Sequence, residues 1–297
     1  MKNKQLESNL LLLLTAAIWG LAFVAQRVGM DYLGPFTFNA VRFLLGSISL
    51  IPAVRIFYRE RDLRKIDIKV VKYGILAGIV LFAGSSFQQV GLVYTTAAKA
   101  GFITSLYIIL VPIMGIVIGQ KTNKYIWIGA TIAVVGLYLL SIKEDFSIAF
   151  GDLLQLIGAF FWATHILLIG EFTNKVNPLR LSQIQFATCS FLSFIVAILF
   201  ETIELNSIIN AYIPIIYGGV LSVGIAYTLQ VVAQRNAKPG PAAIALSMEA
   251  VFAVIGGILL LNESLDLRGY IGCGLMFLGM VISQLDAFGK DKNSEYV

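Results

Sequence analysis

The chain has 297 residues, of which 58% are hydrophobic and only 13% are charged, and its net charge is +5. A soluble domain of this length usually has about a quarter charged residues and under half apolar residues, so the composition excludes an ordinary soluble protein. The two cysteines stand singly in apolar segments and the one histidine has no metal-ligand spacing. We therefore predict no disulfide framework, no metal site and no cofactor.

Apolar segments long enough to cross a bilayer recur along the whole chain. About 20 apolar residues suffice, because a helix rises 1.5 Å per residue and the hydrocarbon core is about 30 Å thick. The first segment follows Lys2 and Lys4 and runs through Trp19 without a small-residue cleavage site, so we interpret it as an uncleaved helix. Ten segments are predicted, at 9–29, 35–57, 71–92, 97–119, 124–142, 152–170, 181–201, 212–234, 241–262 and 269–287. The predicted fold class is all-α polytopic membrane protein with ten transmembrane helices.

The basic residues favour one side of the membrane. If the N-terminus is cytoplasmic, 17 of the 22 Lys and Arg residues fall in cytoplasmic segments, while Arg42 lies inside a span. This is the positive-inside pattern, and it predicts a multi-pass protein of the cell membrane with both termini cytoplasmic. The basic run at 55–72 is then a topology determinant beside the lipid bilayer, and we predict no nucleic-acid partner.

The two halves of the chain repeat each other at an offset of 142 or 143 residues. The matched positions include Trp19 with Trp162, Pro35 with Pro178, Gln88 with Gln230, Gly129 with Gly272, and Gly136 with Gly279. We predict two five-helix repeats, at 9–142 and 151–287. Because five is odd, the second repeat enters the membrane from the opposite side. Inverted repeats are an architecture of secondary transporters, which bind substrate near the midplane where the repeats meet.

Three segments resemble a known family: "LLTAAIWGLAFVAQR" at 13–27, "VPIMGIVIGQ" at 111–120 and "SMEAVFAVIGGILLLNESLDLRGYIGCGLMFLGMVIS" at 247–283. Together they resemble the EamA-type, ten-helix branch of the drug/metabolite transporter superfamily, over essentially the whole chain. The resemblance implies an exporter or facilitator of small molecules such as amino acids or amphipathic compounds. Members often carry proline after the carboxylate, whereas Ala250 follows Glu249 here. We therefore expect a less kinked helix around Glu249 than in those members.

Glu249 is the only carboxylate in the ninth predicted span. A charge at the centre of a spanning helix costs about 2.5–3.5 kcal/mol, and such residues normally face the bundle interior or a wet cavity. Glu249 is either a site for a substrate ammonium or a proton, or a structural group that holds two helices together. Its repeat mate is Tyr107. The sequence leaves both roles open.

Other polar and aromatic residues lie at related depths in the two halves. Arg42 has Gln185 as its mate, and it could pair with Glu249, meet a substrate carboxylate, or anchor helix ends. His165 could shuttle protons, but a packing role is the simpler interpretation. The predicted substrate-binding or coupling residues are Glu249, Tyr107, Arg42, Gln88, Gln230, Ser85, Trp19, Trp162, His165 and Tyr227. Close helix packing is predicted at Gly115 and Gly119, at Gly256 and Gly257, and at Gly129 and Gly136 with Gly272 and Gly279.

The sequence thus favours a secondary transporter that works by alternating access over two alternatives, and the family resemblance implies that it is an exporter. A membrane-embedded sensor or enzyme would use the same cavity, but no catalytic motif is present. A channel would need a continuous polar pore, whereas the polar residues here cluster near mid-span. We expect a small-molecule substrate, and a homodimer is compatible with the sequence.

Overall fold

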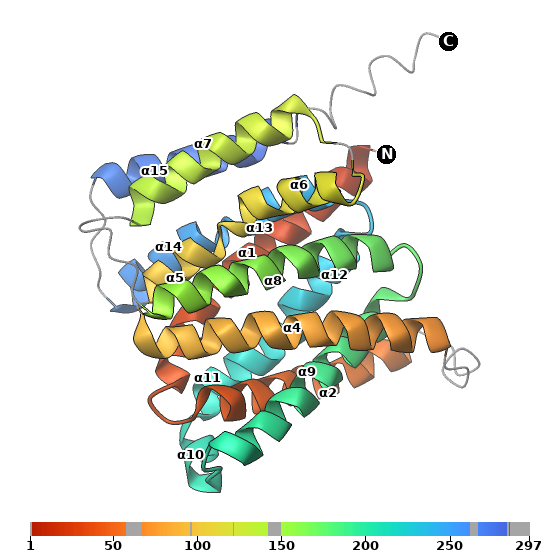
Figure 1. The fold of residues 1–297 in the computed structure, drawn as a ribbon, viewed down its shortest axis with the longest axis vertical. Coiled ribbons are helices and arrows are strands. Elements are labelled where there is room, and N and C mark those ends of the chain that lie inside the picture. Colours follow the sequence, from red (N-terminus) through yellow and green to blue (C-terminus); the bar gives the residue numbers. More distant parts are fainter. Residues whose placement is uncertain are drawn as a thin grey trace.

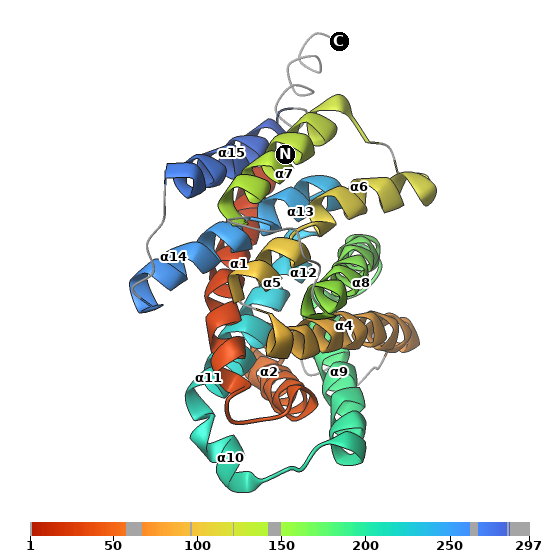
Figure 2. The ribbon, with the colours of Figure 1, turned by 60° about the vertical axis from the view of Figure 1, so that its left-hand side comes forward.

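A computed structural model gives the fold and describes residues 2–57, 67–95, 97–120, 122–141, 150–261, 267–283 and 285. Within these ranges every regular element is a helix (Figures 1 and 2). The first half contains α1 (Lys2–Gly29), α2 (Pro35–Phe57), α4 (Ile68–Tyr94), α5 (Ala97–Thr104), α6 (Tyr107–Val117) and α7 (Lys124–Ser141). The second contains α8 (Phe150–Phe172), α9 (Pro178–Phe200), α10 (Leu205–Asn210), α11 (Tyr212–Ile216), the π-helix η1 (Tyr217–Tyr227), α12 (Thr228–Ala233), α13 (Pro239–Leu246), α14 (Glu249–Leu261) and α15 (Leu267–Ser283).

The helices confirm the predicted fold class. Among the described residues, eight helical segments are long and apolar enough to cross a membrane, and two shorter apolar helices cover Lys124–Leu139 and Leu267–Ser283. These ten segments fall where the ten spans were predicted. The basic residues predicted within 58–66, at 121, 143, 290 and 292, and the "NES" part of the resemblance at 262–264, lie outside the described residues.

The helix contacts follow the pseudo-symmetry of the repeats. Helix α1 packs against α14 and η1, and its repeat mate α8 packs against α6 and α4. Likewise α2 contacts η1 as α9 contacts α4, while α2 pairs with α9 and α7 with α15 across the two halves. Figures 1 and 2 show α7 and α15 side by side at one end of the molecule. The two halves are therefore interleaved, and their interface runs through the centre of the bundle.

Glycines allow the closest of these approaches. A Cβ added at Gly136 would lie 2.5 Å from the carbonyl oxygen of Gly272, and one at Gly279 would lie 2.5 Å from that of Gly129. This confirms close packing at the four glycines of α7 and α15. A Cβ at Gly256 would meet Leu21 of α1 at 2.6 Å, which confirms close packing there too.

Gly119 has a different role from the one predicted. A Cβ there would meet nothing within 4 Å, so Gly119 does not mediate helix packing. Its φ of +81° instead places it in the left-handed region, where glycine commonly ends a helix. A Cβ at Gly115 would meet only the side chain of Gln120, at 3.2 Å. The surroundings of Gly257, which would decide its predicted packing role, are outside what the structure describes.

The fourth and ninth spans are both interrupted at matching positions. Helix α5 ends at Thr104 and α6 begins at Tyr107, while α13 ends at Leu246 and α14 begins at Glu249. The span breaks directly before Glu249 although no proline stands there, and the expectation of a helix less kinked than in members with proline stays a prediction. The Ser247 hydroxyl donates a hydrogen bond to the Ile244 carbonyl at 2.8 Å. Such bonds compete with the helical ladder and bend helices without proline.

Candidate substrate site

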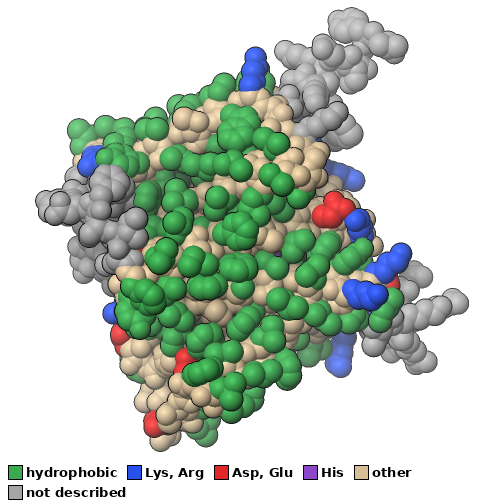
Figure 3. Space-filling view, viewed as in Figure 1, with side chains coloured by type: hydrophobic (Ala, Val, Ile, Leu, Met, Phe, Trp, Pro, Cys, Tyr) green, Lys and Arg blue, Asp and Glu red, His purple; other side chains and the backbone are tan. Residues whose placement is uncertain are grey.

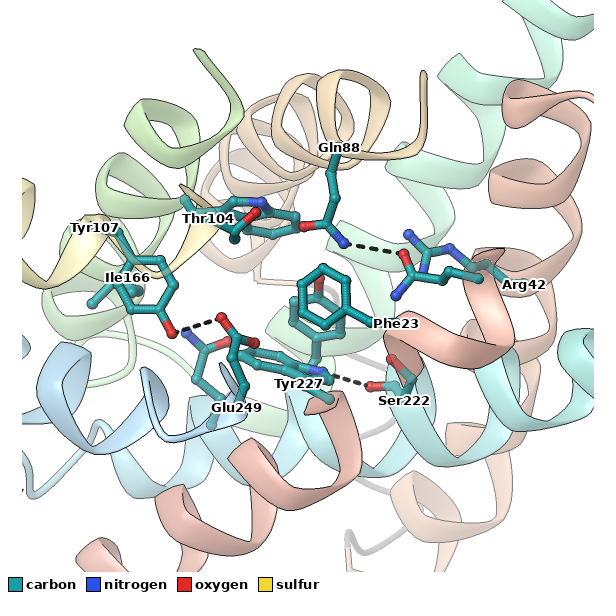
Figure 4. Close-up of a pocket in the computed structure, with 13 residues that line it drawn as sticks. Phe23, Arg42, Gln88, Thr104, Tyr107, Ile166, Ser222, Tyr227 and Glu249 are labelled. Atoms are coloured by element: carbon teal, nitrogen blue, oxygen red, sulfur yellow. Dashed lines mark hydrogen bonds between the residues drawn. The ribbon is translucent and has the colours of Figure 1, made fainter. Parts of the chain in front are cut away.

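A cavity lies where the two halves meet. Its wall consists of Trp19, Phe23, Gln26, Arg42, Gln88, Thr104 and Tyr107 from the first half, and Trp162, Ile166, Ser222, Tyr227, Gln230 and Glu249 from the second (Figure 4). The space that water can occupy inside it is about 30 Å³, which is room for roughly two water molecules. A metabolite can therefore enter only when the side chains of the wall move. Among the described residues, no group of three or more His, Cys, Asp or Glu residues could hold a metal ion.

Glu249 and Tyr107 form one end of this cavity. The Tyr107 hydroxyl donates a hydrogen bond to Glu249 Oε1 at 3.0 Å, and both side chains are buried. Each residue begins the second helix of its broken span, so the carboxylate lies at a helix N-terminus, where the helix dipole favours negative charge. The contact joins repeat mates across the interface of the halves. Glu249 thus links two helices and also lines the cavity.

Arg42 is the buried cation of the cavity. Its Nε donates to Asn39 Oδ1 at 2.9 Å, and its guanidinium carbon lies 4.8 Å from the centre of the Phe43 ring and 5.6 Å from that of Phe38. In the part of the chain that the structure describes, no carboxylate is within ion-pair distance of Arg42, and its Nη2 atom is buried without a hydrogen-bond partner. The Arg42–Glu249 ion pair is therefore not formed. Figure 4 shows the two residues on opposite sides of Phe23.

Aromatic rings occupy the middle of the cavity. The two tryptophans that match each other in the repeat both contact Tyr227, with ring centres 4.5 Å away for Trp19 and 6.1 Å away for Trp162. Trp19 Nε1 donates to the Ser222 carbonyl at 3.2 Å, whereas Trp162 Nε1 is buried and has no partner among the described residues. The two tryptophans therefore occupy matching positions in the repeat but differ in their hydrogen bonding.

The matched glutamines show the same asymmetry. Gln88 Nε2 donates to Gln26 Oε1 at 3.1 Å. Gln230 Oε1 is buried, and no described residue donates to it. The cavity wall thus contains a free indole donor and a free amide acceptor besides the guanidinium.

Two predicted site residues lie behind the wall instead of lining it. Ser85 is buried and donates to the Phe82 carbonyl at 3.2 Å. His165 Nε2 lies 2.9 Å from Gln185 Oε1, and its ring stands edge-on to Trp162 and Tyr227, 6.2 Å from each ring centre. His165 thus packs against two residues of the wall, and the Ser85 carbonyl accepts from Asn39, which in turn holds Arg42. Direct binding by either residue remains a prediction.

Five wall residues were not among those predicted. Phe23 and Gln26 follow Trp19 by four and seven residues, so they share its face of α1, and this spacing could have identified them. Thr104 is a polar residue at the break of the fourth span. Ile166 follows Trp162 by four residues, as Phe23 follows Trp19, so the same spacing could have identified it. Ser222 lies in the π-helix and carries no such signal.

Comparison with known proteins places this architecture in a family. The model of the EamA-like transporter family matches residues 7–142 and again 149–284. An "Uncharacterized transporter" of Archaeoglobus fulgidus is 34% identical, over 95% of this chain and 87% of its own length. "Uncharacterized transporter YoaV" of Bacillus subtilis is 22% identical, over 90% of this chain and 92% of its own. A solved crystal structure superposes with a TM-score of 0.77 at 19% identity, covering 94% of this chain and 96% of its own, so it shares the fold. The chain belongs to the EamA-like transporter family.

Proposed function

We propose that this protein is a secondary transporter, which exports small organic metabolites, such as amino acids or amphipathic compounds, across the cell membrane by alternating access. One observation carries the proposal: a buried cavity is lined by both inverted halves, with Glu249 at the break of a discontinuous helix. Discontinuous helices at the repeat interface form the substrate sites of such transporters. The proposed direction of transport rests on the family resemblance alone.

A second hollow supports alternating access. It has about 260 Å³ of space and is lined by Val111 and Pro112 of α6, by Ile126 of α7, and by residues 238–241 at the start of α13. Val111 is one helical turn from Tyr107, so a single turn of α6 separates this hollow from the central cavity. We assign it as the vestibule through which substrate enters when the halves rock.

The distribution of charge supports an orientation in which this vestibule faces the cytoplasm. The start of α1 and the end of α15 lie at the same end of the molecule (Figures 1 and 2). On the face seen in Figure 3, apolar side chains cover the middle, while the Lys and Arg side chains gather mainly along the right-hand edge, where α4 begins. Epitope tags at both termini should react with antibody only after the cells are permeabilised. Labelling of a tag on intact cells would overturn this orientation.

Metabolite efflux from proteoliposomes tests the proposed function. Vesicles with the wild-type protein are loaded with a mixture of metabolites, and the solutes that leave faster than from empty vesicles are identified. Glu249→Gln should slow the efflux of those solutes about tenfold or more, because the loss of about 1.4 kcal/mol of binding free energy is enough for a tenfold change. Glu204→Gln, on an exposed residue that accepts only a weak bond from Ser207, is the matched control.

The outcomes separate two claims. If no solute leaves faster than from empty vesicles, the proposed function is wrong. If Glu249→Gln and Glu204→Gln both transport like wild type, the protein is still a transporter, but Glu249 is a structural residue.

A further inference from the structure

We infer that the substrate carries two opposite charges, and that it binds across the cavity with its anionic group on Arg42 and its cationic group at Glu249. This inference rests on the proposed function and narrows its substrate to an amphoteric organic molecule. It also assigns each charge of the substrate to one half of the transporter.

The unpaired charge of Arg42 points to an anionic group on the substrate. A guanidinium remains protonated in proteins, and a buried charge is normally paired with an opposite charge. Arg42 is only 1% exposed, yet its partners among the described residues are neutral: the Asn39 amide oxygen and the faces of Phe38 and Phe43. Its Nη2 has no acceptor. A carboxylate or similar anion entering the cavity supplies the missing charge and the missing acceptor, in the geometry that arginine recognises best.

The repeat shows that packing alone does not require this charge. The mate of Arg42 is Gln185, a fully buried neutral side chain that bonds to His165. A glutamine thus fits at the same depth in the other half. Asn39 fixes the Arg42 side chain through Nε, which leaves the other nitrogens free for a ligand.

The position of Glu249 points to a cationic group on the substrate. Its carboxylate lines the cavity on α14, whereas Arg42 lies on α2 of the first half. Among the described residues, the Glu249 side chain accepts a hydrogen bond only from the neutral Tyr107 hydroxyl, so an ammonium group would add the counter-charge. Figure 4 places Phe23 and Tyr227 between the two charged residues.

The space between the charges selects the body of the substrate. Trp19 and Trp162 line the same cavity and pack against Tyr227, which suits an aromatic or aliphatic body. A substrate that contacts both Arg42 and Glu249 connects the two halves. Substrate binding can therefore be coupled to the rocking of the halves.

Ligand binding to the purified full chain tests the inference. Stabilisation against heat is titrated with three sets of probes that share a body: phenylalanine, phenethylamine and 3-phenylpropionate; leucine, isopentylamine and 4-methylpentanoate; 6-aminohexanoate, hexylamine and hexanoate. We expect wild type to bind the two-charge member of at least one set about tenfold more tightly than either single-charge member.

The variants assign the poles. Arg42→Gln should bind the two-charge compound and its amine counterpart equally, while it keeps the preference over the acid. Glu249→Gln should show the reverse. Arg42→Lys should keep both preferences, and Arg27→Gln, which removes an exposed charge paired with Asp31, should behave like wild type. Unliganded melting and size-exclusion profiles verify that each variant is folded.

Several results would overturn the inference. One is binding of single-charge compounds alone, or of no probe in the panel. Another is an equal loss for all three members of a set in Arg42→Gln, which would make Arg42 structural. The efflux screen distinguishes these failures from a failure of the proposed function, because a transported solute with fewer than two charges removes the inference but leaves the transporter.

Discussion

The contact between α7 and α15 gives the sharpest stability prediction. A Cβ at Gly279 would lie 2.5 Å from the Gly129 carbonyl oxygen, whereas ordinary contact starts at 3.4 Å, so the helices would have to separate by about 0.9 Å. The obstacle is backbone, and it cannot rotate away as a side chain would. Overpacking of this kind costs about 1–3 kcal/mol. Gly279→Ala should therefore lower the melting temperature of the purified protein, measured by intrinsic fluorescence in detergent.

The same helix supplies the control. A Cβ at Gly274 would meet nothing within 4 Å, and alanine is favoured over glycine inside a helix by up to about 1 kcal/mol. Gly274→Ala should thus melt at the wild-type temperature or above it. Equal melting temperatures for the two variants would refute the close approach of α7 and α15 at Gly279.

Two further stability predictions follow from hydrogen bonds that join the halves. The Glu201 carboxylate accepts the Phe36 N–H at 2.9 Å and the Thr37 N–H at 2.7 Å, which caps α2 from the end of α9, so Glu201→Gln should destabilise the protein by about 1 kcal/mol in thermal unfolding. Unchanged melting would remove this capping role. Trp19→Phe should destabilise by about 1 kcal/mol more than Trp162→Phe, because only Trp19 loses an indole hydrogen bond. Equal melting of the two tryptophan variants would contradict that difference.

The spans and the repeat could be predicted because the bilayer and the symmetry leave strong signals. Each crossing needs a run of about 20 apolar residues, and matched positions such as Gly136 and Gly279 mark the packing faces. The pairing of Tyr107 with Glu249 was predicted as a symmetry relation, and the structure shows it as a hydrogen bond.

Local backbone geometry and the side-chain partners could not be read from the sequence in the same way. The break after Leu246 occurs in an apolar run that is interrupted only by Ser247 and Glu249 and contains no proline from 243 to 261, where an ordinary helix would satisfy the hydropathy equally well. The π-helix η1 likewise has no distinct hydropathy. The sequence allows three roles for Arg42, and the choice among these roles depends on which side chains surround it. Asn39 lies one turn earlier on the same helix, but Phe43 and Phe38 are ordinary apolar residues in the sequence.

Alternating access requires that one cavity between the halves opens in turn to each side of the membrane. Thr104 lines this cavity and its side chain is similar in size to that of cysteine, so Thr104→Cys can be made in a protein whose two native cysteines, Cys189 and Cys273, are replaced. A membrane-impermeant maleimide is then applied to vesicles of each orientation, with and without a transported solute from the efflux screen. If the cavity opens to both sides, Thr104→Cys is labelled from each side of the membrane, and the solute protects it on both. Labelling from one side only, whether or not the solute is present, would contradict alternating access.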